Sequence, residues 1–228
     1  DDWTLSADFG ERMNAANVKL TLLVNPHAPS GNLVPAARLE ALANQLNSLL
    51  LIDEAYIDFV EGGESALNLV KTHENVIVLR TLSKGYSLAG LRFGYGVAAQ
   101  SLIDPMLNKT RDSYNLDTIS QRIAEVALSD QNHALENCRK VIAERNLLAA
   151  TLRSMSMESP PSQANFLLVS VPALGISAPS LQQALSDKGV LVRYFDHPRL
   201  ADKLRISIGT PTENATLVAA IKDILTLP

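Results

Sequence analysis

The amino-acid sequence predicts an α/β fold in which a mostly parallel sheet is flanked by helices and followed by a smaller C-terminal α+β domain. Three observations lead to this expectation. Short apolar runs alternate with amphipathic helical segments through the first half, as in a parallel sheet with helical crossovers. The 228 residues are 46% hydrophobic and 19% charged, an ordinary globular balance. Beyond Pro105 the pattern changes to long helices, and beyond Pro160 to mixed strands and helices.

The first half contains four apolar runs that we interpret as strands: residues 18–25, 49–52, 76–79 and 93–97. The first run ends in a turn rich in proline and glycine. A helix is predicted over residues 35–48, because leucines at 39, 42 and 46 share one face. The run 49–52 is stopped by Asp53, which indicates a buried strand with a carboxylate at its carboxyl end.

The second half begins with the longest predicted helix, residues 132–155, which contains no glycine or proline and is followed by the break Pro160-Pro161. The remaining predicted elements are a strand at 166–171, a helix at 180–188, strands at 190–194 and 204–208, and a helix from Glu213. We therefore expect part of a large domain over residues 1–131, and a connecting long helix with a small domain over 132–228.

Composition excludes several classes of protein. A net charge of −4 and a pI near 5.6 give no footprint for nucleic acid or an anionic membrane. No apolar run is long enough to span a bilayer, and the acidic start lacks the features of a signal peptide. The single cysteine, Cys138, indicates a reducing compartment, so we expect a cytoplasmic protein and a packing role for this thiol. Four histidines are too scattered to predict a metal site: His27, His73, His133 and His197.

Three polar clusters follow predicted strands, where ligands gather in open α/β sheets. They are the stretch from Asp53 to Tyr56, the stretch from Thr81 to Lys84 with Arg92 behind it, and the turn 25–31. Each residue has an ordinary structural interpretation when taken alone: a capping or paired carboxylate, a core-edge tyrosine, a solvated lysine, a salt-bridged arginine. Together, two hydroxyls, an amine and a guanidinium after one strand are suited to holding a phosphate near an amine.

The ensemble resembles the fold-type I aminotransferases that use pyridoxal 5′-phosphate (PLP), and within them the histidinol-phosphate aminotransferase family. Four stretches carry the resemblance in the family's order and spacing: NPHAPSG (25–31), LLLIDEAYIDF (49–59), TLSKGYSLAGLRFGY (81–95) and LRISIGTPTEN (204–214). The resemblance implies a PLP-binding large domain and a reaction in histidine biosynthesis, namely amino transfer between L-histidinol phosphate and 2-oxoglutarate.

The resemblance also implies residue roles. Lys84 would be the Schiff-base lysine and the base that moves a proton, and Asp53 would pair with the pyridinium nitrogen so that the ring can accept electrons. Tyr56 would hydrogen-bond the cofactor's 3′-oxygen. Phosphate binding would fall to Thr81, Ser83 and Arg92.

Substrate binding is implied for residues of the second half. Arg205 would bind the amino donor's carboxylate, and with Arg193 it would also hold a substrate phosphate, because planar guanidinium groups bind either anion through paired hydrogen bonds. The alternative is two salt bridges on the small sheet. Asn115 is a candidate site-lining residue, with a helix N-cap as the alternative. Relatives complete each site with partner residues, so a homodimer is expected.

The sequence departs from the family's pattern in two places. The family's turn has an asparagine directly before Pro-Ser-Gly, where this chain has Ala28. One hydrogen bond of about 0.5–1.5 kcal/mol is therefore absent, and we assign that role neither to Asn25 nor to His27. Relatives also have a substantial portion before the first match, so we expect the sequence to be a fragment.

Three alternatives remain. Gly94, Gly96 and Ala99 formally fit a dinucleotide fingerprint, although the preceding strand already contains the first glycine. A related PLP enzyme, such as an aromatic amino acid aminotransferase or threonine-phosphate decarboxylase, would share the anchoring motifs. A catalytically silent regulatory domain would keep the fold, but retention of the lysine, carboxylate, phenol and arginine together argues against it.

Overall fold

A computed structural model describes residues 3–62, 65–171 and 175–225, which form two compact units. The first unit contains the residues up to Ala28 together with Leu33–Asn137. The second contains Pro29–Asn32 and the residues from Cys138 onward. The chain therefore passes from one unit to the other inside the turn 25–31 and inside the helix α5 (Gln131–Ser154). Each unit is described by itself.

The first unit is built on a four-stranded sheet in the order β1-β2-β3-β4. The strands are β1 (Leu20–Val24), β2 (Leu49–Asp53), β3 (Val76–Thr81) and β4 (Gly94–Ala98). The pairs β1–β2 and β2–β3 are parallel, and β3–β4 is antiparallel. This confirms the predicted α/β fold with a mostly parallel sheet. Because Val24 pairs with Asp53 and Asp53 with Leu79, β1, β2 and β3 end at the same edge of the sheet.

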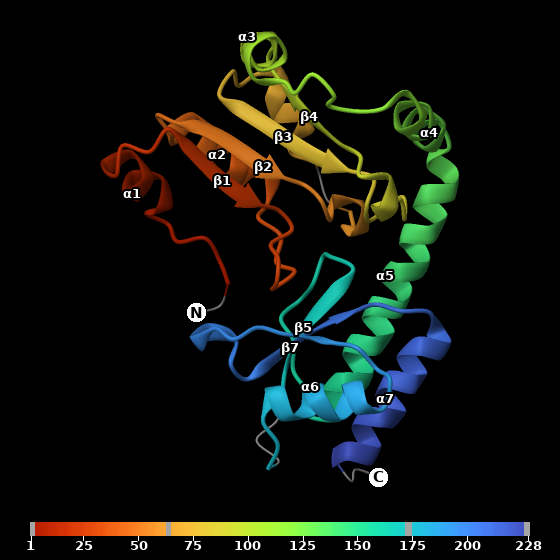
Figure 1. Cartoon of the computed structure of the whole chain (residues 1–228). Coiled ribbons are helices and arrows are strands. Elements are labelled where there is room, and N and C mark those ends of the chain that lie inside the picture. The colour runs from red at the N-terminus through yellow and green to blue at the C-terminus, as the bar shows by residue number, and fades with distance from the viewer. Residues whose placement is uncertain (1–2, 63–64, 172–174, 226–228) are drawn as a thin grey trace. The chain divides into compact units, whose positions relative to one another are not determined.

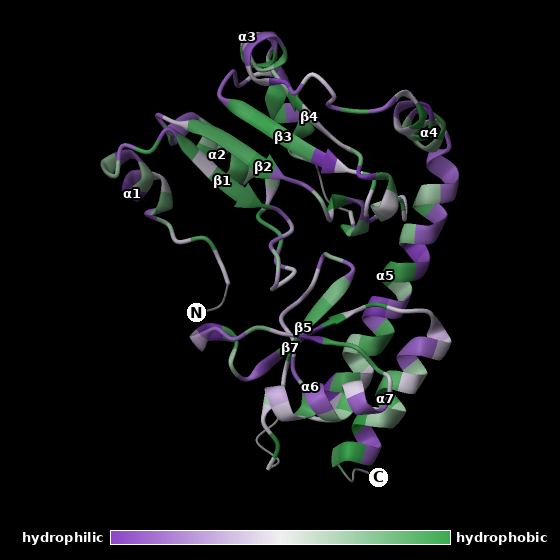
Figure 2. Cartoon of the chain, viewed as in Figure 1, coloured by the Kyte–Doolittle hydropathy of each residue, from purple (hydrophilic) through white to green (hydrophobic). Residues whose placement is uncertain are grey.

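One face of this sheet is covered by α2 (Ala36–Gln45), which lies against β1 and β2 in Figure 1. Leu39 and Leu42 of this helix are fully buried, and they pack in one core cluster with Leu50, Ile52 and Val78 of the sheet. Figure 2 shows the central strands as almost continuously hydrophobic, as expected for strands of a parallel sheet.

The remaining helices of the first unit are short or peripheral. They are α1 (Phe9–Ala15), α3 (Gln100–Pro105) and α4 (Thr118–Ser129), with 3-10 turns η1 (Ile57–Phe59), η2 (Ala66–Lys71) and η3 (Ala89–Leu91) and a π turn η4 (Met106–Thr110). Two of the 3-10 turns, η1 and η3, lie in the loops that follow β2 and β3, so they shape the edge at which the candidate site residues gather.

The strand β1 forms one edge of the sheet among the described residues. Its side chains alternate: Thr21 is 4% exposed and hydrogen-bonds Ser48 at 2.9 Å, whereas Leu20 and Leu22 are 47% and 58% exposed. In the described part of the chain, this strand therefore presents apolar side chains to solvent and has a strand partner on one side only.

The second unit contains a three-stranded antiparallel sheet in the order β5-β7-β6. Its elements are β5 (Phe166–Ser170), α6 (Ala178–Asp187), β6 (Arg193–Tyr194), the 3-10 turn η5 (Pro198–Leu200), β7 (Lys203–Ser207) and α7 (Pro211–Leu225). A core cluster joins the end of α5 to β5, β7, α6 and α7 through side chains such as Leu148, Leu167, Leu181, Leu204 and Ile221. Cys138 is 3% exposed in α5.

Two expectations from the sequence differ from the structure. The strand predicted at 190–194 is wrong in length, because only Arg193–Tyr194 pairs. The N–H of Val190 donates to the carbonyl of Leu185 at 2.9 Å, and Gly189 has φ +78°, so this stretch completes the end of α6 instead. The dinucleotide alternative also fails: Gly94 and Gly96 lie within β4 and do not form a strand-to-helix turn.

Within the described part of the chain, no helix combines the length and apolar character needed to cross a bilayer.

The contact between α2 and the sheet leads to a stability prediction. Leu39→Ala should lower the free energy of unfolding by about 2–5 kcal/mol, because it removes a fully buried side chain and leaves a cavity in the core. The neighbouring Glu40→Ala, on the exposed face of the same helix, is the matched control and should change stability little. Urea unfolding of both variants gives the comparison, and equal effects would show that α2 does not pack as described.

Candidate functional site

Asp53 is the last residue of β2, and its carboxylate is oriented by its own loop. Its Oδ1 accepts the N–H of Ala55 at 3.0 Å, and its carbonyl accepts the N–H of Asn25 at 2.8 Å. Asn25 is buried and its side-chain amide exchanges two hydrogen bonds with Val34, at 2.7 and 3.1 Å. Asn25 therefore ties the start of the turn 25–31 to Val34 and to the end of β2.

Lys84 and Tyr56 come from different strand ends and lie close together. The Lys84 Nζ is 5.7 Å from the centroid of the Tyr56 ring, and both residues are half-buried. The loop after β3 is folded back by two backbone bonds, from Ser87 N to the Lys84 carbonyl at 3.1 Å and from Leu88 N to the Leu82 carbonyl at 3.0 Å. The structure thus brings together an amine and a phenol that are 28 positions apart.

The predicted phosphate-binding hydroxyls lie in the same loop. Thr81 Oγ1 is 2.9 Å from Ser83 Oγ, and it accepts the N–H of Ser83 at 3.1 Å. Arg92 ends η3 with a left-handed φ of 57°, is exposed, and donates from Nη1 to the carbonyl of Ala89 at 2.8 Å. The hydroxyl pair is therefore preformed by local hydrogen bonds, while Arg92 is held to its own turn.

Asn115 is exposed in the segment that leads to α4. The N-cap of that helix is Asp117, whose carboxylate accepts the N–H of Ser120 at 2.8 Å. The N-cap alternative for Asn115 is therefore wrong, because the helix begins two residues later than that interpretation required.

Arg193 of β6 and Arg205 of β7 are directly opposite each other on two adjacent antiparallel strands of the second unit's sheet. The Arg205 guanidinium lies over two aromatic rings, 5.1 Å from the centroid of Phe166 and 5.4 Å from that of Phe195. Arg193 lies 5.5 Å from the Phe195 centroid. The Nε of Arg205 is buried and has no hydrogen-bond partner among the described residues. Among the described residues, aromatic rings flank the guanidinium groups of Arg193 and Arg205. The salt-bridge alternative required carboxylates in these places.

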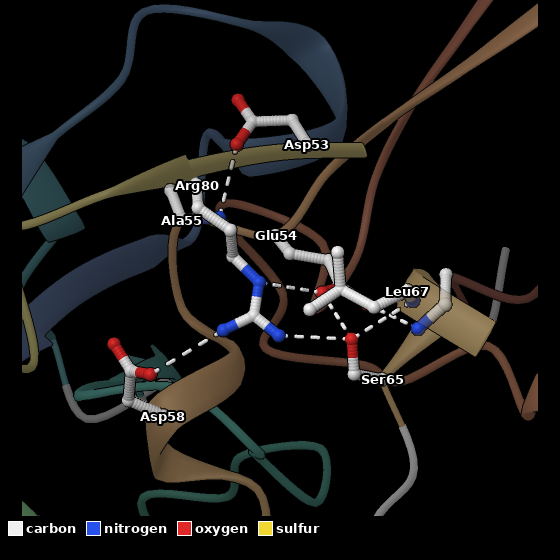
Figure 3. Close-up of polar contacts among 8 residues, drawn as sticks. Asp53, Glu54, Ala55, Asp58, Ser65, Leu67 and Arg80 are labelled. Carbon is white, nitrogen blue, oxygen red and sulfur yellow. Dashed lines mark hydrogen bonds and ion pairs between the residues drawn. The ribbon is translucent and has the colours of Figure 1, made fainter. Parts of the chain in front are cut away.

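A buried charge network that sequence reasoning missed lies beside Asp53 (Figure 3). Arg80 Nε is 2.8 Å from Glu54 Oε2, and Arg80 Nη1 is 3.6 Å from Asp58 Oδ1. Ser65 Oγ donates to Glu54 at 2.8 Å and accepts from Arg80 Nη2 at 2.8 Å, and the N–H of Ala66 donates to Glu54 at 2.6 Å. We call Glu54, Asp58, Ser65 and Arg80 the anchor network. In Figure 3 the Asp53 carboxylate points away from the Arg80 guanidinium.

The anchor network changes the acidity of one member. Burial raises the pKa of the Asp58 carboxyl above its ordinary 3.8, the cation of Arg80 partly offsets this, and the anion of Glu54 adds to it. The side chain of Glu54 is fully buried. The sequence did contain a signal for this network. Glu54 is next to Asp53 and Arg80 is next to Thr81, and neighbouring residues of a strand point to opposite faces, so a second polar group on the other face could have been expected.

The chain carries a family match over almost its whole length. Residues 4–221 match the model described as aminotransferase class I and II. The chain belongs to that family. It is 47% identical over 211 residues to histidinol-phosphate aminotransferase 1 of Nostoc sp., a match that covers 92% of this chain and 58% of that protein.

Two solved structures extend the comparison. The histidinol-phosphate aminotransferase of Sinorhizobium meliloti, solved in complex with pyridoxal-5′-phosphate, is 29% identical with a TM-score of 0.85, and the match covers 96% of this chain and 60% of that one. A decarboxylase from Sulfurospirillum multivorans is 26% identical with a TM-score of 0.88, over 99% and 67%. This aminotransferase-family chain thus spans 58% of the length of its Nostoc relative, and its fold is shared with a decarboxylase.

The described residues contain no group of three histidine, cysteine, aspartate or glutamate side chains placed to hold a metal ion. The charged groups at the end of the sheet are an amine, guanidinium groups and carboxylates from the loops after β2 and β3. The cationic side chains suit a ligand with an anionic group such as a phosphate, and the carboxylates suit a basic nitrogen on the same ligand.

The raised pKa of Asp58 predicts a pH-dependent effect of Asp58→Asn. Because the folded state holds the Asp58 proton more tightly than the unfolded state, this group's contribution to stability falls as the pH rises above 3.8. The asparagine side chain does not ionise, so the variant does not lose this stability as the pH rises. The difference in free energy of unfolding, Asp58→Asn minus parent, should therefore become more positive between pH 4 and pH 7. Urea titrations at several pH values measure the difference, and a gap that stays constant across this range would contradict the assignment.

Proposed function

We propose that the chain is the cofactor-binding portion of a PLP-dependent aminotransferase that transfers the amino group between L-histidinol phosphate and 2-oxoglutarate in histidine biosynthesis. The observation that carries the proposal is the meeting of Lys84 with Tyr56 beside the Thr81–Ser83 hydroxyl pair. It is supported by the 47% identity to a histidinol-phosphate aminotransferase. The cytoplasm is the proposed compartment, in keeping with a single buried cysteine.

The chemistry of the donor set fits PLP. A phosphate needs hydrogen-bond donors and positive charge, which two hydroxyls 2.9 Å apart and a guanidinium supply. An aldehyde needs a primary amine, and a ring nitrogen that must stay protonated needs a carboxylate, which Asp53 supplies at the end of a buried strand. When bound, PLP supplies an electrophilic carbonyl and a ring that accepts electrons. Thr81, Ser83 and Arg92 would hold its phosphate, and Asp53 its ring nitrogen.

Lys84 would be the residue that bonds the cofactor and later moves a proton through its Nζ. The Tyr56 ring beside that amine would keep it out of bulk water and set the direction from which it acts. The Tyr56 hydroxyl would donate a hydrogen bond to the cofactor's 3′-oxygen. With Ala28 in the turn, Tyr56 would carry this contact without an asparagine from residues 25–31.

Substrate binding is proposed for the arginine pair of the second unit. Arg205 would bind the α-carboxylate of the amino donor, and Arg193 would help to hold the phosphate of histidinol phosphate. The support is the register pairing of the two residues across β6 and β7 and the approach of both guanidinium groups to the Phe195 ring. In addition, the buried Nε of Arg205 has no hydrogen-bond partner among the described residues. Flat aromatic rings beneath Arg205 hold the guanidinium plane in one orientation without neutralising its charge.

The quaternary arrangement and the domain limits are part of the same proposal. We expect a homodimer, as the family resemblance implies, with Asn115 lining the site. Asn115 is exposed, and the N-cap of α4 is Asp117 rather than Asn115. A large domain over residues 1–131 and a connecting helix with a small domain over 132–228 would divide cofactor binding from substrate anion binding. The small-molecule partners would be an amino donor and a 2-oxo acid acceptor.

The first test traps the cofactor. Incubation with PLP followed by borohydride reduction should attach the label to the peptide that contains Lys84, as read by mass spectrometry. Lys84→Arg, which keeps the charge but not the nucleophile, should abolish that label, and Lys71→Arg, an exposed lysine on η2, should not. A label that survives Lys84→Arg would overturn the assignment.

The second test asks for the substrate in the full-length protein. Histidinol phosphate should be preferred over phenylalanine, tyrosine, aspartate and threonine phosphate as amino donor. Arg205→Lys should impair both half-reactions, whereas Arg193→Lys should impair the reaction of the phosphorylated donor more, because an ammonium cannot form paired hydrogen bonds. Preference for an unphosphorylated donor would refute the histidine pathway, and carbon dioxide release from threonine phosphate would replace transfer with decarboxylation.

A further inference from the structure

Three of the residues proposed to contact the cofactor lie close to the anchor network in the sequence. Asp53 precedes Glu54, Thr81 follows Arg80, and Tyr56 begins the turn that contains Asp58. At the ends of β2 and β3, successive side chains point to opposite faces. Glu54 and Arg80 of the anchor network therefore point to one side of the two strand ends, and Asp53 and Thr81 point to the other.

The network reaches Lys84 through Gly85. A Cβ built on Gly85 would lie 2.7 Å from both Cβ and Cγ of Asp58, so the Asp58 side chain packs directly on the Gly85 backbone. Gly85 is buried and does not have a positive φ that would demand glycine. Glycine is required at position 85 because any side chain there would clash with Asp58, and not because of the backbone conformation.

The bonds of the network connect three separate segments. Arg80 of β3 contacts Glu54 after β2, Ser65 before η2 and Asp58 in η1 through its three guanidinium nitrogens. Glu54 in turn accepts hydrogen bonds from Ser65 and from the N–H of Ala66. The planar fork of arginine fixes these directions together, which a lysine could not do. A displacement of Asp58 is therefore resisted by both strand ends at once.

From this geometry we propose that Glu54, Arg80 and Asp58 act as positioning residues for Lys84. The contact of Asp58 with Gly85 sets the distance between the Lys84 amine and the side chains of Asp53 and Tyr56. The inference rests on the proposed function only for what Lys84 does, since the contact itself is a property of the chain without cofactor. None of the three residues is proposed to touch the cofactor or the substrate.

The loop provides a matched pair of substitutions. Gly85→Ala places a methyl group against Asp58, whereas Gly90→Ala, five residues along the same loop, places it in open space with no atom within 4 Å. Reductive ¹³C-methylation of the chain, with Lys84→Arg to assign the signal, reports the surroundings of the Lys84 amine by NMR. We expect the Lys84 signal to shift in Gly85→Ala and to stay at the parental position in Gly90→Ala. Equal shifts in both variants, or none in either, would overturn the proposal.

A rescue variant separates positioning from general damage. Asp58→Gly removes the side chain that the methyl group added at position 85 would meet, so Asp58→Gly with Gly85→Ala should fold even if Gly85→Ala alone does not. Because the methyl group added at position 85 takes part of the space that the Asp58 side chain leaves, the double variant should return the Lys84 signal partly toward the parental position, whereas Asp58→Gly alone should shift it. A double variant that remains as disturbed as Gly85→Ala would show that Asp58 is not the group Gly85 accommodates.

Borohydride trapping of the same variants keeps this inference distinct from the proposed function. If the parent labels Lys84 and Gly85→Ala labels it as fast as Gly90→Ala does, positioning is refuted while the function stands. If the parent labels another lysine, the function is refuted, and the NMR comparison still decides whether Asp58 positions the loop. Support for both requires slower labelling in Gly85→Ala and recovery in the double variant.

Discussion

The buried ion pair between Arg80 and Glu54 is the constraint on which the functional end of the sheet depends. Its atoms approach to 2.8 Å with the Glu54 side chain fully excluded from solvent. Removing a carboxylate from water is costly, and attraction to one cation alone often fails to offset the cost. Here Ser65 and the N–H of Ala66 donate two further hydrogen bonds to the carboxylate, which makes the arrangement tolerable. All these bonds form only when β2 and β3 pair in one particular register. We therefore expect the ion pair to fix the geometry of the two strand ends rather than to add stability.

Much of the framework could be predicted from the sequence, for reasons visible in particular residues. The strands β2 and β3 are continuous apolar runs, a pattern typical of strands that are buried on both faces. The positions of Asp53 and Lys84 near the carboxyl ends of the strands could be predicted, because Asp53 ends β2 and Lys84 follows Thr81, which ends β3. Local pattern also predicts α2, whose leucines recur with helical spacing.

The rest depended on contacts distant in the sequence. Glu54 meets Arg80 only because β2 and β3 pair in one particular register, and no local pattern encodes that register. Asp58 packs on Gly85, 27 positions away, and a glycine in a loop more commonly serves turn geometry than close packing. The shortened β6 and the capping of α4 by Asp117 were decided by hydrogen bonds at helix ends, where strand propensity and capping compete over one or two residues.

The exposed leucines of β1 have a consequence for handling the protein. An edge strand with unpaired backbone groups and exposed apolar side chains can pair with another strand, either from the same chain or from a second molecule. The 47% and 58% exposure of Leu20 and Leu22 places such a template at a border of the sheet formed by the described residues. For this chain by itself, we therefore expect association between copies to begin at this strand as the concentration rises, while the interior remains folded.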